Sequence, residues 1–425
     1  MLIFDVIDKK RKGLNLTKDE IEFAVNGFVK GDVLPEQMSA LLMAIVINGM
    51  SDKETYHLTK IMQNSGKTYK FPFEVVDKHS SGGVGDSTTL ILLPTLAALG
   101  VKVAKMSGKS LGFTGGTIDK VSCFQNFKTD LTQKQFENVI TKVGGSVISQ
   151  SEEIALADKK IYALRDKCAC VESIPLIASS IMSKKLACGS NTILLDVKYG
   201  SGAFMKTKAS AIKLAKTMVK LGKLDGKNVV AMVTNMNTPL SNGIGCGPEV
   251  YSVIKALKGE EGSLLSLSKT LSAQLYSMAT NIDYAESLRR VEQTLVTGKA
   301  EEKLREIVKY QGGSVEVFDA PESLLDAKVK TKINSTISGY VKSIDALTLA
   351  RVEKYLQQTA NEQNKKFCGI MLNVKVGDYV KHGDLLATLY SYEKVNIEVV
   401  NMFYSGFEFS NKKVKPVKLV AKIIK

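Results

Sequence analysis

The stretch that determines the fold is FEVVDKHSSGGVGDSTTLILLPTLAALG, residues 73–100. It begins with a short apolar run typical of a strand, continues through a loop of glycines, hydroxyls and basic residues, and ends in an apolar run typical of a helix. A second strand, VKVAKM at 101–106, follows directly. Strands that alternate with helices in this way predict a parallel sheet with helical crossovers.

The segments on either side of this unit have a different character. Capping boxes at Thr17/Glu20 and Ser51/Glu54 and an apolar run after Pro35 make the first 66 residues helical. Residues 155–190 are again helical and interrupt the alternating unit, whereas β-branched residues and Gly-Asp turns predominate from residue 331. We therefore predict an α/β domain with a mixed or parallel sheet, a discontinuous all-helical domain, and a C-terminal α+β region rich in strands. The expected boundaries are 1–66 with 156–191 (helical), 67–155 with 192–330 (α/β) and 331–425 (C-terminal).

The composition is that of a soluble globular protein, with 44% hydrophobic and 24% charged residues. The longest nearly uncharged run, residues 38–50, is shorter than the roughly 18–20 residues that a membrane span needs. The N-terminus places apolar residues before basic ones, the reverse of a secretory signal. Six cysteines form neither a dense disulfide framework nor a zinc-binding spacing. We expect a cytoplasmic protein that has no membrane partner.

The formal net charge of +15 raises the question of a nucleic-acid partner. Of the 58 basic residues only six are arginine, and the lysines are scattered without interleaved aromatic residues. Diffuse lysine is typical of a solvated surface, or of a general attraction for anionic small molecules. We expect no nucleic acid to bind.

The loop at residues 77–90 has the chemistry of an anion site. It matches neither GxxxxGK[ST] nor GxGxxG. A strand that leads through glycines and hydroxyls into a helix nevertheless gathers backbone N–H donors at the positive end of a helix dipole. A second loop of this kind, KMSGKSLGFTGGTIDK at 105–120, follows the next strand. Because adjacent parallel strands end at one edge of the sheet, the two loops predict a shared phosphate cradle; a turn that is merely tightly packed would explain the glycines alone.

Four ordered motifs carry a resemblance to a known family. They are DKHSSGGVGDSTTL (77–90), SGKSLGFTGGTIDK (107–120), YALRDKCACVESIPLIASSIMSKKLA (162–187) and LLDVKYGSGAFM (194–205). In this order and spacing they resemble the thymidine and pyrimidine-nucleoside phosphorylases, over almost the whole chain. The resemblance implies a pentosyltransferase with no organic cofactor, in which inorganic phosphate attacks the anomeric carbon of a pyrimidine nucleoside and releases the base and a pentose 1-phosphate.

The same resemblance implies roles for individual residues. It assigns catalysis to His79, Arg165 and Lys184, and contacts with the pyrimidine to Arg165, Ser180 and Lys184. The residues that it assigns to phosphate are Lys78, Ser80, Thr89, Lys105, Ser107 and Thr117. It also implies a potassium site at Gly85, Ser87, Leu240 and Gly243, for which Glu249 and Ser252 compete as the carboxylate position.

Elementary chemistry agrees with these assignments. Ser180 and Lys184 are four residues apart and share one helical face. As the glycosidic bond lengthens, negative charge grows on the leaving base, and cations such as Lys184 stabilise it. The unperturbed pKa of a histidine side chain would allow His79 to donate a proton or a hydrogen bond to the base. General acid and orienting donor remain two alternatives for His79.

The sequence departs from the family pattern in its second loop. Lys109 replaces an arginine and cannot reproduce its fork of donors, and Ser110, Phe113 and Ser122 replace the usual glycine, histidine and glutamate. Lys105 resembles the lysine of the broad-specificity enzymes, so we expect uridine, deoxyuridine and thymidine as substrates. A strict thymidine phosphorylase is the near alternative.

Two other classes of protein share part of this pattern. A phosphoribosyltransferase would have a similar layout but needs a magnesium-pyrophosphate site, for which no paired acidic motif is apparent. A non-catalytic nucleotide binder would explain the net charge. We favour the phosphorylase. We also expect a homodimer that associates through the apolar helix at residues 38–47, and a domain closure with hinges near 66–70, 153–156 and 190–193.

Overall fold

The computed structural model describes residues 1–109, 115–151 and 153–425. Its N-terminal part is a helical domain, as the capping boxes predict: Thr17 and Ser51 accept hydrogen bonds from the amides of Glu20 and Glu54. The core of this domain includes Leu42. The helices are α1 (Ile3–Arg11), α2 (Lys18–Lys30), α3 (Pro35–Asn48), α4 (Asp52–Asn64), α8 (Leu156–Lys167) and α9 (Ile174–Ala187).

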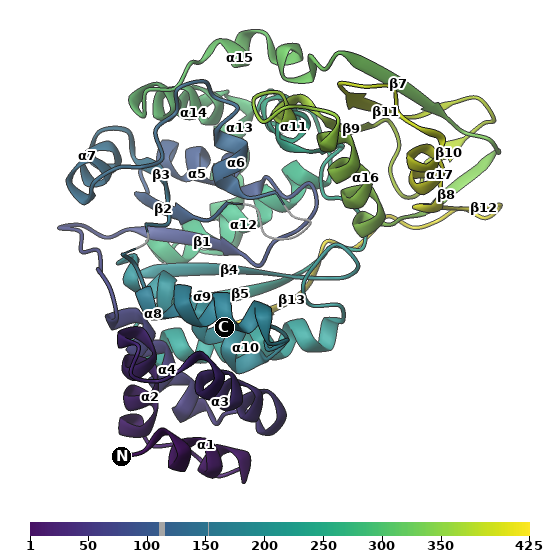
Figure 1. Cartoon of the computed structure of the whole chain (residues 1–425). Helices are drawn as coiled ribbons and strands as arrows, with labels where there is room; N and C mark the ends of the chain where they lie inside the picture. Colours follow the sequence, from purple (N-terminus) through teal and green to yellow (C-terminus); the bar gives the residue numbers. More distant parts are fainter. Residues whose placement is uncertain (110–114, 152) are drawn as a thin grey trace.

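A six-stranded mixed sheet forms the centre of the molecule, in the order β13-β5-β4-β1-β2-β3 (Figure 1). Its first five strands in the chain are parallel to one another, as the alternation of strands and helices predicts. β13 pairs with β5 in the antiparallel sense. The bounds are β1 (Val76–Ser80), β2 (Val103–Ser107), β3 (Gly145–Ser149), β4 (Thr192–Tyr199), β5 (Asn228–Asn235) and β13 (Val420–Ile424).

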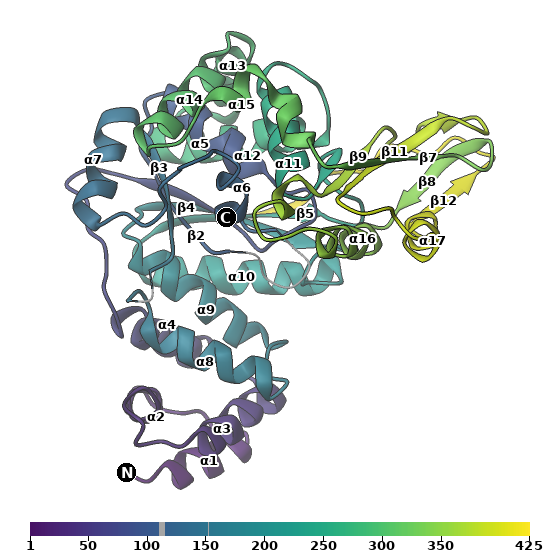
Figure 2. The same cartoon turned by 45° about the horizontal axis from the view of Figure 1, so that its top comes forward.

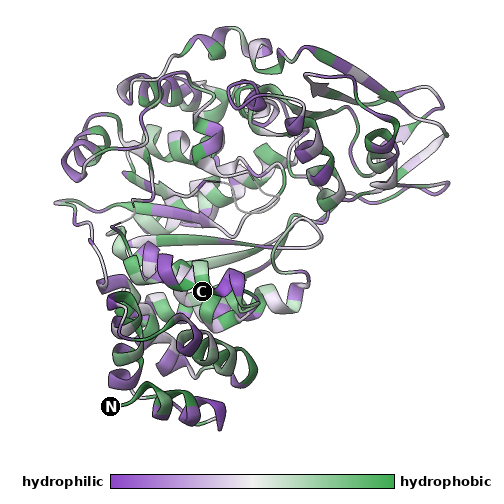
Figure 3. Ribbon diagram, viewed as in Figure 1, coloured by the Kyte–Doolittle hydropathy of each residue, from purple (hydrophilic) through white to green (hydrophobic). Residues whose placement is uncertain are grey.

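Helices cover both faces of this sheet. In β4, Ile193 and Leu195 pack on the side of α9 and α10, and Leu194 packs in the larger core with α5 and α12. Neighbouring residues of a strand point to opposite faces, so one strand serves both layers. Figure 3 shows hydrophobic residues in green along the strands of this sheet and along the helices that cover it. The helices are α5 (Thr88–Ala98), α6 (Thr117–Val121), α7 (Gln133–Val143), α10 (Lys208–Leu224), α11 (Cys246–Leu257), α12 (Ser263–Thr280), α13 (Tyr284–Val296), α14 (Lys299–Tyr310) and α15 (Glu316–Asp319).

The C-terminal region projects to one side, away from the N-terminal helices (Figure 2). It contains two small sheets, in the orders β10-β8-β12 and β6-β9-β11-β7. The bounds are η1 (Pro321–Leu325), β6 (Gly243–Ile244), β7 (Val329–Asn334), β8 (Gly339–Ile344), α16 (Ala346–Gln358), η2 (Lys365–Phe367), β9 (Gly369–Leu372), β10 (Tyr379–Val380), β11 (Leu385–Ser391), α17 (Ile397–Ser405) and β12 (Phe407–Ser410).

The predicted C-terminal segment 331–425 does not end within its own sheets. Residues 420–424 form β13 at the edge of the large sheet, and β6 of the α/β segment joins β9 in return. An alternating apolar run predicts a strand but not its partner, so the sequence pattern could not place residues 420–424. Within the described residues, no helix is long and apolar enough to cross a membrane.

Candidate active site

The first phosphate loop lies at the carboxyl end of β1 and leads into α5. Lys78, His79 and Ser80 are the last three residues of the strand. Gly85 has φ +69°, and a Cβ at this position would lie 2.9 Å from the amide nitrogen of Ser241, so glycine is required. The Ser87 side chain does not cap α5, although the Thr88 amide donates to Asp86 Oδ1 at 3.4 Å and the Leu90 amide to Ser87 O at 3.0 Å. The positive end of the helix dipole still faces this loop.

A network of short hydrogen bonds fixes the loop. The Lys78 ammonium donates to Thr88 Oγ1 at 2.7 Å, and the Thr88 hydroxyl donates to Asp86 Oδ1 at 2.7 Å. The Ser80 hydroxyl donates to Asp86 Oδ2 at 2.5 Å and accepts from the Gly82 amide at 3.2 Å. Ser80 and Lys78, both expected to contact phosphate, are therefore held on the same carboxylate-centred network.

Two neighbouring strands supply the buried charges behind this network. Asp196 of β4 lies 3.2 Å from Lys78 Nζ and 2.8 Å from Lys198 Nζ, and all three residues are at most 1% exposed. Lys198 also lies 3.6 Å from Asp86. Burial opposes the ionisation of Asp86, but Lys198, Lys78 and Lys120 outweigh it and hold its pKa well below the usual range.

Lys105 of β2 lacks a carboxylate of its own. Its ammonium donates to the carbonyl oxygen of Lys78 at 2.6 Å and lies 3.4 Å from Asp77. Asp77, which is completely buried, makes its closer ion pair with Lys185 of α9 at 2.7 Å. Burial lowers the pKa of Lys105 to about 7, with Lys185 and Lys78 adding to the effect and Asp77 opposing it.

This arrangement predicts a pH dependence of phosphate affinity. Lys105 is charged below about pH 7 and neutral above it, so raising the pH removes a positive charge from the phosphate site. We expect the KM for phosphate to rise between about pH 7 and 9 in the wild type. In Lys105→Met it should stay near the high-pH value throughout. Steady-state kinetics of both proteins over the same range checks this, since the ionisation of phosphate itself affects both alike; parallel profiles would contradict it.

His79 lies among ammonium groups at the end of β1. Its side chain is partly exposed at the surface of the protein, yet the surrounding protein and charges lower its pKa well below the usual range. Burial is the larger cause, and the cations that add to it are Lys185, Lys105, Lys184 and Lys78. The neutral imidazole is therefore the form present near neutral pH, and it can donate a hydrogen bond but carries no acidic proton to transfer.

The remaining predicted phosphate residues lie at the same edge of the sheet. Ser107 is the last residue of β2, which is a direct neighbour of β1. Thr117 is the first residue of α6, and Thr89 lies in the first turn of α5. The two loops thus begin at adjacent strand ends. Lys109 is exposed, whereas Ser110 and Phe113, two of the departures from the family pattern, lie outside the described residues.

Lys184 and Ser180 of α9 come together as their spacing predicts. Lys184 Nζ donates to Ser180 Oγ at 3.1 Å and forms an ion pair with Asp158 of α8 at 2.7 Å. The Lys184 side chain is 24% exposed, whereas Ser180 and Asp158 are buried. Among these three residues, only Lys184 thus has substantial contact with the solvent that a base would displace.

Arg165 makes its hydrogen bonds to the backbone. Arg165 is 1% exposed, and its guanidinium donates to three backbone carbonyl oxygens, two in the segment after α8 and one in the first turn of α9. These are Cys170 O at 3.1 Å, Val171 O at 2.7 Å and Leu176 O at 3.2 Å. Burial lowers its pKa. In this conformation Arg165 ties down the segment that leads into α9, so its predicted contact with the base remains a prediction.

The residues expected to hold potassium form a compact cluster around Glu249, which is already paired. Lys120 Nζ lies 2.7 Å from Glu249 Oε2, and the Ser87 hydroxyl donates to the same oxygen at 2.8 Å. The carbonyl oxygen of Gly243 accepts from Ser241 at 2.5 Å. The Leu240 amide donates a hydrogen bond to Val84 O at 3.1 Å.

Ser252, the other position considered for the carboxylate, donates to Pro248 O at 2.9 Å and accepts from the Gly243 amide at 3.1 Å. The charge that a bound cation would supply is thus supplied to Glu249 by Lys120. Among the described residues this donor set does not fit a potassium ion.

Sequence reasoning missed several residues of the site. Five charged residues lie within or beside the four quoted motifs, but the sequence predicted no role for them. They are Asp86, Asp158, Lys185, Asp196 and Lys198. Their signal is the presence of charged residues in stretches that are otherwise apolar or glycine-rich, because such residues are rarely buried without partners.

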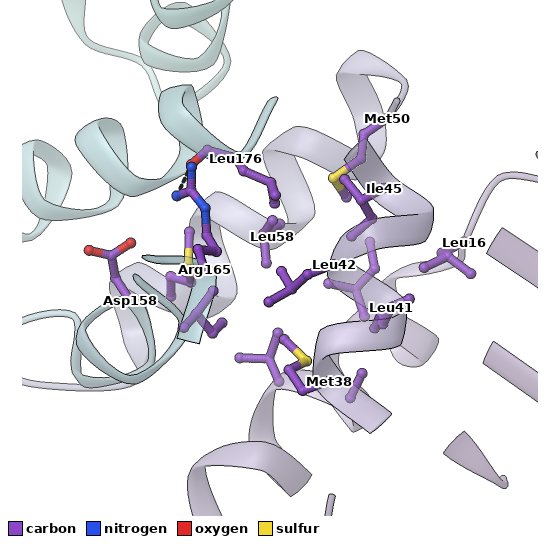
Figure 4. A pocket seen from close by; sticks show the side chains of 15 residues that line it. Leu16, Met38, Leu41, Leu42, Ile45, Met50, Leu58, Asp158, Arg165 and Leu176 are labelled. Atoms are coloured by element: carbon purple, nitrogen blue, oxygen red, sulfur yellow. Dashed lines mark hydrogen bonds between the residues drawn. The ribbon is translucent and has the colours of Figure 1, made fainter. Parts of the chain in front are cut away.

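Two cavities lie near the residues described above. A small apolar cavity of about 20 Å³ lies in the core of the helical domain; Asp158 and Arg165 lie at its edge, with the Asp158 carboxylate directed away from the apolar side chains (Figure 4). A larger one, of about 380 Å³, lies between α6, α11 and α16, where Glu249 and Glu353 contribute to its lining.

Three family models match the chain in succession. The helical bundle domain of a glycosyl transferase family matches residues 4–66, and the a/b domain of that family matches residues 73–301. A pyrimidine nucleoside phosphorylase C-terminal domain matches residues 340–410. The fold and the anion loops thus define a glycosyl transferase built from a helical bundle and an α/β domain.

Curated relatives narrow this class. The chain is 42% identical to the pyrimidine-nucleoside phosphorylase of Bacillus subtilis (strain 168), with all of both chains covered. It is 41% identical to that of Staphylococcus haemolyticus (strain JCSC1435), again with all of both chains covered. The chain belongs to the pyrimidine-nucleoside phosphorylase family. This confirms the resemblance that the four motifs carry.

A solved structure shares the fold at much lower identity. The anthranilate phosphoribosyltransferase (TrpD) of Thermus thermophilus superimposes with a TM-score of 0.59 at 15% identity, over 73% of this chain and 100% of that one. At this identity the likeness concerns the fold alone. In the part of the chain that the structure describes, no cluster of three or more His, Cys, Asp or Glu residues could hold a metal ion.

Proposed function

We propose that the protein catalyses the phosphorolysis of pyrimidine nucleosides, with uridine, deoxyuridine and thymidine as substrates. Inorganic phosphate is the co-substrate, and the products are the free base and ribose or deoxyribose 1-phosphate. The observation that carries the proposal is the position of two anion loops at adjacent strand ends, next to a helix that presents Lys184 with Ser180. The full-length identity to enzymes of that name supports it.

The chain's own residues account for the steps of this reaction. The N-terminal end of α5, Lys78 and Ser80 hold the phosphate dianion at the sheet edge. Charge then separates as the glycosidic bond lengthens, leaving the sugar positive and the base negative. The phosphate faces the sugar, and the Lys184 ammonium stabilises the base. A unit charge pair at ~4 Å and an effective dielectric constant of ~20 contributes about 4 kcal/mol before desolvation.

His79 acts in this scheme as a neutral hydrogen-bond donor. Its lowered pKa leaves the imidazole uncharged at neutral pH, so its N–H orients a carbonyl oxygen of the base and does not transfer a full proton in advance. Lys184 and His79 then share the charge of the leaving group. Of the two alternatives left by the sequence, the orienting donor is the one that the environment of His79 favours.

The decisive experiment measures base release from uridine and thymidine with and without phosphate. Release that requires phosphate, with pentose 1-phosphate as the second product, supports the proposal. Release without phosphate would identify a hydrolase. A phosphoribosyltransferase would leave both nucleosides intact and would instead convert a free base and 5-phosphoribosyl 1-pyrophosphate to a nucleotide and pyrophosphate. Binding without turnover would favour the non-catalytic nucleotide binder.

The same proposal includes a homodimer formed by the N-terminal helices. Most apolar residues of α3 pack inside their own domain, but Met43 and Ile47 remain 36% and 73% exposed. Leu2 and Phe4, at the N-terminal end of α1, are 67% and 72% exposed, and α1 packs against α3. Exposed apolar residues on neighbouring elements are typical of interaction sites.

Ile47→Glu is therefore expected to convert the dimer to a monomer. A charge placed in an apolar interface loses its water without gaining a partner, which costs several kcal/mol. Light scattering after gel filtration measures the mass. Val296→Glu is the control, because Val296 is 87% exposed on the distant helix α13. A monomeric wild type, or a dimeric Ile47→Glu variant, would contradict this interface.

Potassium takes no part in this scheme, since the cluster around Glu249 carries its counter-ion in Lys120. The proposed location is the cytosol, where the six cysteines, all free in the structure, would stay reduced.

A further inference from the structure

Lys185 of α9 is a buried cation that contacts two strands of the large sheet. The residue is 5% exposed. Its ammonium donates to Asp77 Oδ2 of β1 at 2.7 Å and to the backbone carbonyl oxygen of Met106 in β2 at 2.9 Å. Burial opposes the charge on Lys185, but Asp77 outweighs it and raises the pKa of the ammonium. Lys185 therefore stays charged and joins α9 to both strands.

Asp77 depends on Lys185 for most of its charge compensation. Asp77 is completely buried, and its other oxygen, Oδ1, makes no hydrogen bond within the described residues. This oxygen lies 3.4 Å from Lys105 Nζ, which donates its own hydrogen bond to Lys78 O at 2.6 Å. Because a buried charge that loses its partner is strongly destabilising, the contact between Lys185 and Asp77 is a firm link between α9 and β1.

Lys185 and its neighbour Lys184 make contacts in two directions from one helix. Successive residues of an α-helix are about 100° apart around its axis, and Lys184 pairs with Asp158 of α8 at 2.7 Å whereas Lys185 pairs with Asp77. Since the two lysines are adjacent in the backbone, a fixed Lys185 also fixes the point from which the Lys184 side chain extends. The helix that carries Lys184 is thus held to the strand that carries His79.

The charge of Lys185 also acts on His79. Burial is the largest cause of the lowered pKa of His79, and Lys185 is the largest of the charged contributors. A nearby cation disfavours the imidazolium form. Asp77 lies two residues earlier, on the same face of β1. The cations that act on the imidazole are Lys78 of its own strand, Lys105 of β2, and Lys184 and Lys185 of α9.

We propose that Lys185 is a positioning residue, which fixes the separation between Lys184 on α9 and His79 on β1, the two groups assigned to the leaving base. Lys185 touches neither the base nor the phosphate in this scheme, and it acts through Asp77 and the backbone of β2. The inference rests on the proposed phosphorolysis and gives a role to a residue outside the predicted set.

Lys185→Met is expected to lower kcat for uridine phosphorolysis by roughly 10- to 100-fold, because a displacement of about 1 Å in a positioned group can cost about 10²-fold in rate. The KM values for uridine and phosphate should change less than kcat, since no group that binds either substrate is removed. Steady-state kinetics separates the two constants.

A second variant separates positioning from stability. Asp77→Asn combined with Lys185→Met replaces the ion pair with neutral groups, so it leaves no uncompensated charge between α9 and β1. Thermal unfolding should show that this double variant recovers stability relative to Lys185→Met, while kcat stays low. Recovery of both stability and kcat would show that Lys185 only stabilises the fold, and would overturn the proposal.

Lys10→Met is the matched control. Lys10 is 1% exposed and pairs with Glu54 at 2.9 Å in the helical domain. This variant removes an equally buried cation from an ion pair that does not include α9 or the sheet. It should lose thermal stability and keep a kcat near the wild-type value.

The titration of His79 provides a measurement that needs no turnover. The chain has three histidines, so NMR of protein labelled at histidine follows each of them, and His79→Gln assigns the signal. Lys185→Met should raise the pKa of His79 toward its usual range, because the largest charged contributor to the lowering is removed. Lys10→Met should leave the titration unchanged.

The outcomes distinguish this inference from the proposed function. An unchanged titration of His79 in Lys185→Met, or a kcat near the wild-type value, would overturn the role of Lys185. Absence of phosphate-dependent base release in the wild type would instead overturn the proposed function, whatever the titration of His79 shows.

Discussion

Lys184→Ala is expected to lower kcat/KM for phosphorolysis by roughly 10²- to 10³-fold, the loss that follows removal of one group that stabilises developing charge. The ammonium lies 2.7 Å from Asp158 and 3.1 Å from Ser180, and its side chain is 24% exposed. It is thus held in one orientation while one side remains open to a base. Steady-state kinetics with uridine measures the effect, and circular dichroism checks that the fold is retained.

Lys220→Ala is the matched control for this prediction. Lys220 also forms an ion pair with an aspartate, Asp52, but both side chains are more than half exposed, so the pair should contribute little to stability and nothing to catalysis. If Lys184→Ala kept near-normal activity, the stabilisation of the leaving base would have to be assigned to other residues.

Lys78→Gln is expected to raise the KM for phosphate by roughly 10²-fold while the KM for the nucleoside changes little. Glutamine can still donate a hydrogen bond to Thr88, which in the wild type accepts one from Lys78 at 2.7 Å. The rise in the KM for phosphate therefore measures the removal of the positive charge. Asp196 keeps Lys198 as its partner at 2.8 Å, which limits the damage to the fold. Varying phosphate at saturating uridine gives the constant.

Lys10→Gln provides the comparison, because Lys10 is equally buried at 1% but pairs with Glu54 in the helical domain. Both variants should lose stability, and only Lys78→Gln should lose phosphate affinity. Equal effects of the two variants on the KM for phosphate would mean that the change reflects general destabilisation.

Local patterns made much of this fold and site predictable. The boxes at Thr17 and Ser51 locate helix starts because the interaction lies within four residues. The two glycine loops meet because β1 and β2 are adjacent and parallel. Ser180 and Lys184 meet because one helical turn separates them. Each of these inferences needs only the side-chain periodicity of one helix or the order of two neighbouring strands.

Contacts between elements that are far apart in the sequence could not be predicted from such local patterns. Asp158 meets Lys184 only because α8 packs beside α9. Arg165 turns to the backbone because Ala169, with φ +54°, bends the chain in a left-handed conformation that returns the carbonyls of Cys170 and Val171 to the guanidinium. Alanine rarely adopts the left-handed backbone conformation, and no local sequence pattern predicts it at this position.

The antiparallel pairing of β13 with β5 has a consequence for how the protein is made. β5 has an open edge until residues 420–424 have left the ribosome, because its only other partner among the described strands is β4. Exposed strand edges are templates for pairing with other chains, and multidomain proteins are most prone to aggregate while such edges are unpaired. A nascent or truncated chain that lacks these few residues should therefore depend on chaperones far more than its short deletion suggests.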